Sequence, residues 1–478
     1  MKYSLIVRTV PFFLAALLTV SGCARPLEPS DTPSGDERPD IPPCHQAFIP
    51  EPISLETDNT NYRSMAEAIF EGVAVAPASD FTYEMTDSGV CLTAYNGTGG
   101  TVIIPDSIQG APVVALGDGL FQDNTALTAL SIPTSVISIG ANLLTGCRSL
   151  QLLRLPQLGA QRDGLGFLSY FFGCQTPVGT GFRVPSSLDT VILWDTVTEI
   201  PPDAFLECSK LRMVILPDTL ERIGRYAFSD CSQLHFVPLP ASLQSLEKSA
   251  FANCTDLRAV TLPDSLQSMG PGVYEGCSRL QQLTLPFLGE NRNADGYVGY
   301  LFGAQSYMWN ATYVPRQLLS LTLTSGDVAD HAFYGCDRLS QITLPKNCAS
   351  IGVRAFYGCS SLQEIFIPDA TKTVGELAFV GCRALAKVSL PESLQSIGMQ
   401  AFMDCSNLAE ITLPDTLDTI APSTFSGCCN LQTVALGASL STVGAQAFRA
   451  CVSLRQVSGG VSDITVGNGN EYLTYCLE

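Results

Sequence analysis

The residues best suited to chemistry in this chain of 478 residues are its 18 cysteines and three histidines. A thiolate can act as a nucleophile or metal ligand, and an imidazole as a base or ligand. The histidines, His45, His235 and His331, are far apart, and none stands beside a second histidine or a C-x2-C pair. The sequence also lacks H-E-x2-H, G-x-S-x-G and Walker motifs. We therefore expect no enzyme, no metal site and no cofactor.

The cysteines instead mark a repeat. Cys208, Cys231, Cys254 and Cys277 are each 23 residues apart, and the residues between them follow the template C-x2-L-x2-I-x-L-P-x2-L-x2-I-G-x2-A-F-x2-C. A fixed period of this length predicts a solenoid, in which each coil packs on the next. The same frame recurs at Cys147, Cys336, Cys359, Cys382, Cys405, Cys428 and Cys451, and Asn124 takes the position 23 residues before Cys147.

Each coil is built from three elements, and the L-x2-I-x-L element occurs fourteen times between Leu127 and Leu454. Followed by Pro, this element predicts a short parallel strand, because Pro cannot continue a ladder. The next L-x2-I predicts a second, shorter strand on the opposite wall, and A-F-x2-C predicts a helical turn between them. The Phe of that turn should stack from coil to coil. The predicted repeat core contains the frame cysteines with Phe228, Phe251, Phe356 and Phe402.

Twelve cysteines lie in the repeat frame, if Cys174 of an enlarged coil is included. Neighbouring strands lie about 4.8 Å apart with parallel Cβ vectors, whereas a disulfide prefers Cβ atoms about 3.8 Å apart. We therefore predict buried free thiols that pack as small hydrophobic groups. Any disulfides should be sought among the cysteines outside the frame, which are Cys44, Cys91, Cys348, Cys429 and Cys476.

The string A-F-x2-C-x2-L-x2-I-x-[IL]-P resembles that of BspA-like (treponemal-type) bacterial leucine-rich repeat proteins, over roughly residues 80 to 460. The resemblance implies an α/β leucine-rich-repeat solenoid dominated by short parallel strands, with a cap at each end. It also implies a surface-exposed lipoprotein that binds a protein ligand on a host or neighbouring cell.

The N-terminal residues predict export. Lys2 and Arg8 precede an apolar run over residues 10–20, which is too short to span a membrane and is typical of a secretory signal. Val20-Ser21-Gly22-Cys23 looks like a bacterial lipobox, so Cys23 is the expected lipid-bearing residue and the membrane is contacted through that anchor only. Removal of the two signal-peptide cations changes the net charge from −19 to −21, which argues against nucleic acid as a partner.

The chain divides into five predicted parts. These are a signal peptide (1–23), a Pro- and Asp-rich tether (24–60), an N-terminal cap (61–115), the solenoid (116–458) and a C-terminal cap (459–478). In the N-terminal cap, Met65, Ile69 and Phe70 follow Asn61 at helical spacing and predict a short amphipathic helix. Strands are expected at residues 81–84, 90–95 and 102–105.

Two coils carry extra residues, at 157–183 and 287–317, and the two insertions resemble each other. Leu155-Pro156-Gln157-Leu158-Gly159 returns 130 positions later as Leu285-Pro286-Phe287-Leu288-Gly289. Loops held by a rigid scaffold often carry binding residues. A wider coil that was inherited by duplication explains the insertions equally well.

The strand residues that point outward differ between early and late coils. The early coils carry a mainly apolar set that is a candidate protein-binding patch: Leu152, Arg154, Ile192, Met213, Ile215 and Phe236. Alternatively, the enlarged loop of residues 157–183 folds over these side chains and buries them. Protein binding or adhesion is our first functional hypothesis. Glycan capture and a structural spacer of the cell envelope remain alternatives, although the aromatic residues that glycan capture needs are dispersed.

Overall fold

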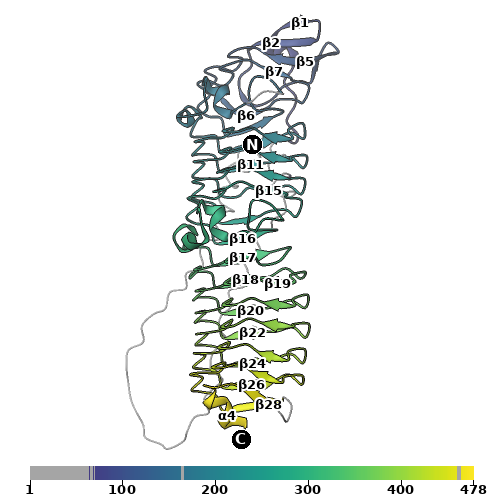
Figure 1. Cartoon of the computed structure of the whole chain (residues 1–478). Coiled ribbons are helices and arrows are strands. Elements are labelled where there is room, and N and C mark those ends of the chain that lie inside the picture. The colour runs from purple at the N-terminus through teal and green to yellow at the C-terminus, as the bar shows by residue number, and fades with distance from the viewer. Residues whose placement is uncertain (1–63, 65–67, 69, 163–165, 460–463, 478) are drawn as a thin grey trace, which may run out of the picture. The chain divides into compact units, whose positions relative to one another are not determined.

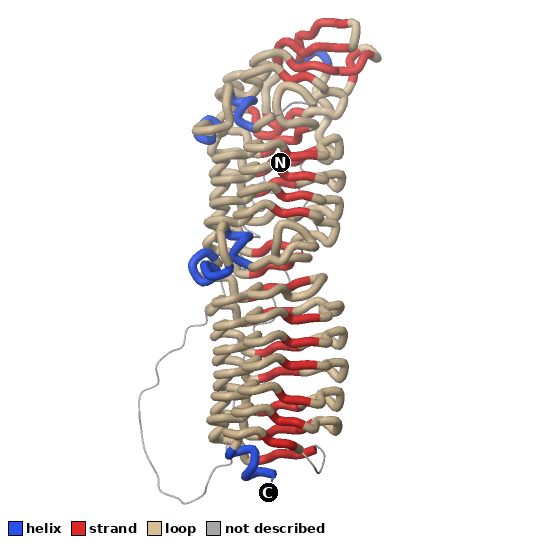
Figure 2. The backbone as a smooth tube through the Cα atoms, in the orientation of Figure 1, coloured by secondary structure: helices blue, strands red, loops and turns tan. Residues whose placement is uncertain are grey.

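The computed structural model describes residues 64, 68, 70–162, 166–459 and 464–477, all of which belong to the compact unit Leu55–Glu478. Cys23, Cys44, the tether and most of the helix predicted around Met65 lie outside the described residues. The unit is a solenoid of parallel-strand coils, as the repeat predicted (Figure 1). The longer strands follow one wall of the coils, whereas the helical segments lie at the enlarged coils and at the two ends of the described solenoid (Figure 2).

The L-x2-I-x-L elements form the longer strands, which pair in parallel along one wall. In chain order they are β3 (Gly100–Ile103), β6 (Leu127–Ser131), β8 (Leu152–Leu155), β9 (Thr190–Leu193), β11 (Met213–Ile215), β14 (Ala259–Thr261), β16 (Gln282–Leu285), β17 (Ser320–Leu323), β18 (Gln341–Thr343), β20 (Glu364–Phe366), β22 (Lys387–Ser389), β24 (Glu410–Thr412), β26 (Thr433–Leu436) and β28 (Gln456–Gly459). Between β11 and β14 only an isolated bridge, Met213 to Phe236, continues the wall. Pro238 in that coil lacks the amide donor that a strand needs.

The L-x2-I elements form the expected shorter strands on another wall. They are β7 (Ser138–Ile139), β10 (Glu199–Ile200), β12 (Arg222–Ile223), β13 (Ser245–Leu246), β15 (Ser268–Met269), β19 (Ser350–Ile351), β21 (Thr373–Val374), β23 (Ser396–Ile397), β25 (Thr419–Ile420), β27 (Thr442–Val443) and β29 (Thr465–Val466). Their register follows the repeat, as in Ile200 opposite Ile223 and Ile223 opposite Leu246.

The A-F-x2-C segment is not a helical turn, and that prediction was wrong. In the coil of Phe228, both Tyr226 and Asp230 have positive φ, at 56° and 64°. Left-handed residues cannot propagate a right-handed helix. The Phe228 amide instead donates to the Ala250 carbonyl of the next coil at 2.7 Å, and the Asp230 amide donates to Ala252 at 2.8 Å. The segment therefore forms a third hydrogen-bonded wall between coils.

The interior is one continuous apolar core, and the frame phenylalanines stack within it. Ring centroids of successive Phe residues lie 4.8 to 5.6 Å apart in the two runs Phe205–Phe251 and Phe333–Phe448. The predicted core residues Phe228, Phe251, Phe356 and Phe402 are buried in this column. Packing between neighbouring coils thus supplies the burial that one coil alone lacks.

The frame cysteines are buried free thiols, as predicted. The Cys231 thiol donates to the Phe205 carbonyl at 3.1 Å, and Cys254 donates to Phe228 at 3.2 Å. The same bond recurs at Cys147, Cys277, Cys359, Cys382, Cys405, Cys428 and Cys451. In these nine coils a small side chain with a donor therefore satisfies a backbone carbonyl in the interior. Asn124 also serves the backbone, since its Oδ1 accepts from the amides of Ala126 and Leu127 at 3.1 Å.

The search for disulfides outside the frame finds none among the described cysteines, which are all free. Cys348 is fully buried because it takes the Leu position of the P-x2-L step after Pro345. Cys429 is exposed, and Cys91 and Cys476 are partly buried.

Both ends of the described stack are closed by atypical elements. At the N-terminal end the 3-10 helix η1 (Ala78–Asp80) leads into the antiparallel pair β1 (Phe81–Thr86) and β2 (Gly89–Tyr95). Next, β4 (Ser107–Ile108) pairs with β5 (Ala111–Leu116), which pairs in parallel with β2 and then with β7. This mixed sheet covers the first coil.

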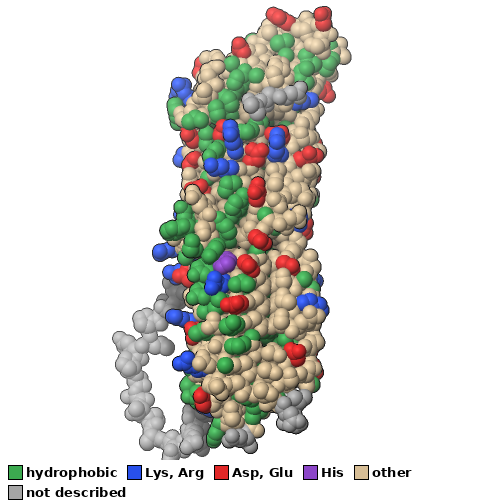
Figure 3. Space-filling view, in the orientation of Figure 1, with side chains coloured by type: hydrophobic (Ala, Val, Ile, Leu, Met, Phe, Trp, Pro, Cys, Tyr) green, Lys and Arg blue, Asp and Glu red, His purple; other side chains and the backbone are tan. Residues whose placement is uncertain are grey.

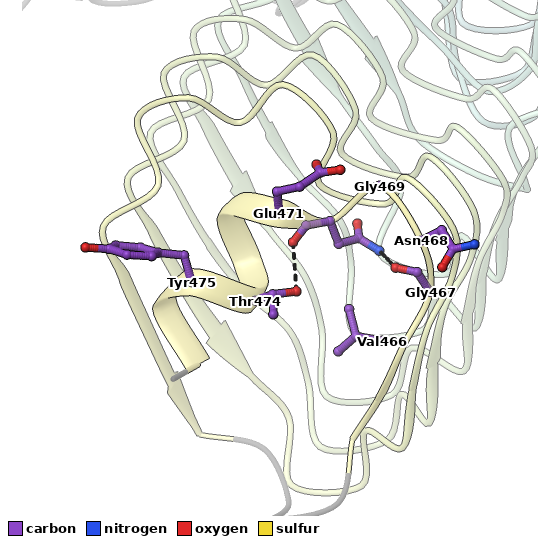
Figure 4. A pocket seen from close by; sticks show the side chains of 8 residues that line it. Val466, Gly467, Asn468, Gly469, Glu471, Thr474 and Tyr475 are labelled. Carbon is purple, nitrogen blue, oxygen red and sulfur yellow. Dashed lines mark hydrogen bonds between the residues drawn. The ribbon is translucent and has the colours of Figure 1, made fainter.

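At the C-terminal end, helix α4 (Glu471–Leu477) lies across the last coil and buries Leu473. The side chain of Asn470 makes the hydrogen bonds to the last coil that the backbone of a following coil makes elsewhere. Its Oδ1 accepts from the Phe448 amide at 2.8 Å, and its Nδ2 donates to the carbonyls of Gly444 and Gly467. A hollow beside α4 is lined by the loop from Val466 to Asn470 and by the first turns of the helix (Figure 4).

Candidate protein contact surface

The outward-facing patch predicted from the sequence is buried rather than exposed. Ile192 and Ile215 have no exposed surface, and Leu152 is also buried. The alternation of the strands was interpreted correctly, because these side chains leave the main core and form a second cluster on the outer face of the sheet. Met213 packs against this cluster.

The other two members of the patch lie at its margin. The Arg154 guanidinium lies 3.3 Å from the centre of the Trp194 ring, and Phe236 is partly buried. A binding role for the six residues stays a prediction.

The residue that covers the second cluster comes from the N-terminal side. Phe70 packs on Leu152, Ile192 and Ile215, together with Ala129. The enlarged loop of residues 157–183 was the alternative cover that the sequence left open, but these buried apolar side chains of the loop join the main core instead: Leu158, Leu168, Phe171 and Phe172.

The two enlarged coils share one structural frame at an interval of 130 residues. The 3-10 helices η2 (Leu168–Phe172) and η4 (Val298–Phe302) occupy equivalent positions, and each ends at a left-handed glycine. Tyr170 Oη donates to the Ile139 carbonyl at 3.4 Å, and Tyr300 Oη donates to Met269 at 3.1 Å. These carbonyls are also 130 residues apart.

Arginine side chains tie each enlarged coil to the coil before it. Arg162 donates to the carbonyls of Thr134 and Val136. Arg292 donates to the carbonyls at the equivalent positions, Asp264 and Leu266. The duplication therefore preserved the anchoring contacts as well as the sequence.

The frame supports two tips of equal length, which we call the first tip (residues 175–183) and the second tip (residues 305–313). The first tip ends in η3 (Gly181–Arg183), and the carboxylate of Glu207 accepts from the amides of Gly179 and Gly181 at 3.1 and 3.4 Å. A Cβ on Gly181 would lie 2.0 Å from the Glu207 carbonyl oxygen, so glycine is required at this contact.

The second tip forms η5 (Tyr307–Trp309) and the short helix α3 (Asn310–Tyr313). The buried Asn310 Oδ1 accepts from the Gly299 amide of η4 at 2.9 Å, which fixes the tip to the frame. Opposite the tip stands Gly335, at the repeat position that Glu207 occupies beside the first tip. At the first tip, the glycine of this contact is Gly181 in the tip itself. At the second tip, it is Gly335 in the following coil.

An aromatic cluster forms where the second tip meets the following coils. The rings of Tyr307 and His331 stack with centroids 4.0 Å apart, and Tyr307 meets Tyr334 edge-on at 5.3 Å. Tyr334 stacks on Tyr357 of the next coil at 5.0 Å, with the ring planes 10° apart. The equivalent positions around the first tip hold Pro177, Asp203, Leu206 and Ser229. The aromatic cluster (Tyr307, His331, Tyr334 and Tyr357) therefore belongs to the second tip only.

Large apolar side chains on the second tip also face solvent. Met308 is 64% exposed and Trp309 is 54% exposed, and Tyr313 follows them in α3. The first tip exposes Val178 and Phe182. Hydrophobic side chains gather along the side of the coils on which the enlarged coils bulge (Figure 3). This contact surface joins the exposed tip residues Met308, Trp309 and Tyr313 to an aromatic cluster that two further coils support.

The electrostatics of the second tip centre on His331. Burial lowers the pKa of the imidazole, with Asp330 opposing this shift and Arg354 reinforcing it. The imidazole ring packs against the Tyr307 ring. His331 itself has a positive φ of 58°, as Arg354 has at the equivalent position of the next coil.

Burial makes frame thiols of the solenoid poor candidates for nucleophilic chemistry. Burial raises the pKa of Cys147 to about 11 and that of Cys208 and Cys277 to about 12. Such thiols stay protonated at neutral pH and are poor nucleophiles. Within the described ranges, no group of three or more His, Cys, Asp or Glu side chains could hold a metal ion.

Sequence reasoning missed the aromatic cluster. Tyr334 and Tyr357 are 23 residues apart and take the same repeat position, which was the available signal. The approach of Tyr307 to them depends on how the insertion folds, and the repeat says nothing about that.

The fold and this surface define a leucine-rich repeat protein. The family model of the BspA type leucine rich repeat region matches in six copies, over residues 102–162, 181–293 and 326–455. The chain belongs to this BspA-type family. Leucine-rich repeat proteins generally mediate protein interactions, and stacked repeats provide the extended surfaces for them.

Solved structures of bacterial leucine-rich repeat proteins resemble this one. A leucine-rich repeat protein from Bacteroides ovatus is 23% identical, with 80% of this chain and 94% of that chain covered and a TM-score of 0.33. A leucine rich cell surface protein from Faecalibacterium prausnitzii is 19% identical, with coverages of 85% and 98% and a TM-score of 0.31. The leucine-rich repeat protein of T. pallidum is 19% identical, with coverages of 70% and 91% and a TM-score of 0.19.

No curated protein matches the sequence. In the part of the chain that the structure describes, no helix has the length and apolar character that crossing a membrane requires.

Proposed function

We propose that this protein is an exported, lipid-anchored leucine-rich repeat protein that binds a protein partner through its second tip and aromatic cluster. The observation that carries the proposal is the exposed run Met308-Trp309 beside the stacked rings of Tyr307, Tyr334 and Tyr357. Tyrosine and tryptophan are enriched at the energetic centres of protein interfaces, since they supply large contact areas at low cost in side-chain entropy.

The rigidity of the site supports binding. Tyr334 and Tyr357 stand on hydrogen-bonded walls of the solenoid, and the tip is fixed through Asn310. Side chains that are already ordered lose less conformational entropy when a partner arrives. The hydrogen bonds that stabilise the coils therefore also order the side chains of the contact surface before a partner binds.

The arrangement of the rings favours a protein partner over a glycan. Tyr307 stacks on His331, and Tyr334 stacks on Tyr357. In each pair, one ring face is covered by the neighbouring ring, whereas a sugar stacks on an open ring face. Phe366 is exposed on a different element, β20, and does not extend a platform. A file of open aromatic faces, which glycan capture requires, is not formed by these residues.

Anchoring rests on the lipobox-like Val20-Ser21-Gly22-Cys23. We expect a metabolic lipid label to be incorporated into the wild-type protein and to be lost in Cys23→Ser. Equal labelling of the two proteins would contradict the anchor without affecting the binding surface.

The binding proposal is tested with the intact ectodomain on paired arrays of extracellular proteins and glycans. Trp309→Ala in the second tip is compared with Phe182→Ala, a matched truncation in the first tip, where Phe182 is 78% exposed. We expect binding to protein spots that Trp309→Ala weakens at least about tenfold and Phe182→Ala leaves intact.

Two results would contradict the proposal. One is binding to glycan spots alone. The other is protein binding that Trp309→Ala leaves unchanged while circular dichroism shows both variants folded.

A further inference from the structure

The outer face of the first sheet is covered by a short segment that precedes the solenoid. We call residues 70–76 the strap. Its Phe70 is 8% exposed and lies in the second apolar cluster with Leu152, Ile192 and Ile215. Farther along, the Ala76 amide donates to the Ile103 carbonyl of β3 at 2.9 Å. The strap therefore runs from the middle of the sheet face to its edge strand.

Within the described part of the chain, residues 70–76 themselves make few contacts with the sheet. Phe70 is its one buried residue, while Glu71, Gly72, Ala74 and Val75 are exposed. The bonds from the Glu71 and Val73 amides go to the carbonyls of Ala68 and Phe70, three residues earlier in each case, and not to the sheet. Burial of a single Phe side chain corresponds to a closed-to-open ratio of roughly ten to a few hundred, so opening is within thermal reach.

The covered face is unlike the same face of later coils. Ile192 and Ile215 are the outward residues of β9 and β11, and the corresponding residues of β14 and β18 are Thr261 and Thr343, which are exposed. The outward apolar side chains are thus concentrated where the strap lies. An apolar face of this kind in an exported protein needs a cover or a partner.

We propose that the strap is a displaceable cover, which occupies an apolar docking face formed by Leu152, Ile192 and Ile215 and uncovers it when Phe70 leaves. This surface is separate from the second tip, so the inference stands independently of the function proposed above. In the closed protein the occupant of the face is the chain's own strap.

The test measures site-resolved thiol labelling in the full mature chain, in a Cys429→Ser background, which removes the one fully exposed thiol among the described cysteines. Met213→Cys places a reporter at the edge of the cluster, where Met213 is partly buried. We expect Phe70→Asp to raise the maleimide labelling rate of this reporter at least about tenfold. Val75→Asp, a change at an exposed strap residue, should leave the rate unchanged.

A second reporter separates opening of the strap from general loosening. Thr343→Cys lies on the same wall in a later coil and is exposed, so its labelling rate should be equal with and without Phe70→Asp. Ala76→Pro, which removes only the amide bonded to Ile103, should raise labelling of the Met213→Cys reporter by a smaller factor. An unchanged rate at that reporter in both strap variants would overturn the proposal, and so would simultaneous labelling of the buried frame thiols.

Discussion

The two enlarged coils are the same structure up to their tips and different structures beyond them. Both hold a 3-10 helix of five residues, an arginine bonded to two carbonyls of the previous coil and a tyrosine bonded to a third. The first tip is then held by the Glu207 carboxylate, whereas the second tip is held by the stacking of Tyr307 on His331. Duplication kept the support and changed the surface that it presents.

This difference suggests how such a solenoid acquires a contact surface. The frame is bonded to coils on both sides, so it tolerates new residues at the tip without loss of the core. The tip then gains ordered neighbours from the following coils, here Tyr334 and Tyr357. Binding residues can therefore arise at one copy while the other remains a wide coil.

The largest expected effect tests the identity of the two frames. Phe172→Ala and Phe302→Ala truncate equivalent buried rings, and each should lower the free energy of unfolding by about 3 to 5 kcal/mol, through lost burial and a cavity. Urea unfolding midpoints of the two variants check this expectation. A large loss in one coil and none in the other would break the equivalence.

A smaller effect should distinguish the tips. Glu207→Ala removes the acceptor for two amides of the first tip, of which the Gly179 bond is exposed and the Gly181 bond is partly buried, and should cost about 1 kcal/mol. Gly335 takes the equivalent position beside the second tip, so no such acceptor exists there to lose. Amide hydrogen exchange in residues 175–183 is the direct measure. Unchanged protection at Gly179 and Gly181 would show that the carboxylate does not hold the first tip.

The tyrosines of the frame should differ only slightly. Tyr170→Phe and Tyr300→Phe each remove one hydrogen bond to a backbone carbonyl, worth about 0.5 to 1.5 kcal/mol. The loss should be greater for Tyr300, because its bond is 3.1 Å against 3.4 Å for Tyr170. The melting temperatures of the two variants test this ranking. A greater loss of stability in Tyr170→Phe than in Tyr300→Phe would contradict it.

The smallest expected effect depends on pH. Burial lowers the pKa of His331 from 6.5, so the unfolded chain binds more protons than the folded one below that pH. The contribution of His331 is therefore present above pH 6.5 and is lost as the pH falls through the folded pKa. Asp203, its counterpart beside the first tip, has a pKa that burial raises, so acidification does not destabilise the first tip through this residue.

Hydrogen exchange at pH 7.5 and pH 5.5 checks the pH effect. We expect faster exchange in the second tip at the lower pH, after correction for the intrinsic rate, and no change in the first. His331→Phe should remove the difference. Equal acid sensitivity of the two tips would contradict the assignment to His331.

Much of the fold could be predicted from the repeat, because burial in a solenoid repeats with it. Leu, Ile, Phe and Cys recur at fixed places, so the strands, the Phe column and the buried thiols followed from one template. The turn did not, since its left-handed positions are held by residues as different as Tyr226, Asp230 and Leu377. Backbone hydrogen bonds between coils fix those angles, and side-chain identity gives little sign of them.

The candidate sites were harder to predict, because they depend on contacts between segments of different periodicity. The outward direction of Ile192 and Ile215 followed from strand alternation, but their cover, Phe70, comes from outside the repeat. Cys348 was taken as a residue outside the frame, although the Leu position after Pro345 places it in the core. The aromatic cluster required the fold of an insertion that only one other coil resembles.

The central claim is that the second tip binds the partner while the shared frame only supports it. Exchange of the tips tests this claim in one direction, in which residues 305–313 are replaced by the nine residues of the first tip. The opposite exchange would place a residue with a Cβ at Gly181, 2.0 Å from the Glu207 carbonyl oxygen. When the first tip replaces residues 305–313, its glycine lies opposite Gly335 without a clash, and the frame should fold.

The measurement is the affinity of this exchanged ectodomain for the strongest protein partner found on the array, beside that of the wild type. We predict a folded variant whose melting temperature is lowered, because the Asn310 bond to Gly299 is lost and Gly335 cannot supply the Glu207 carboxylate. Its affinity should fall by at least about a hundredfold, because several aromatic contacts disappear together. Wild-type affinity in a folded exchange variant would contradict the claim and would place binding elsewhere on the solenoid.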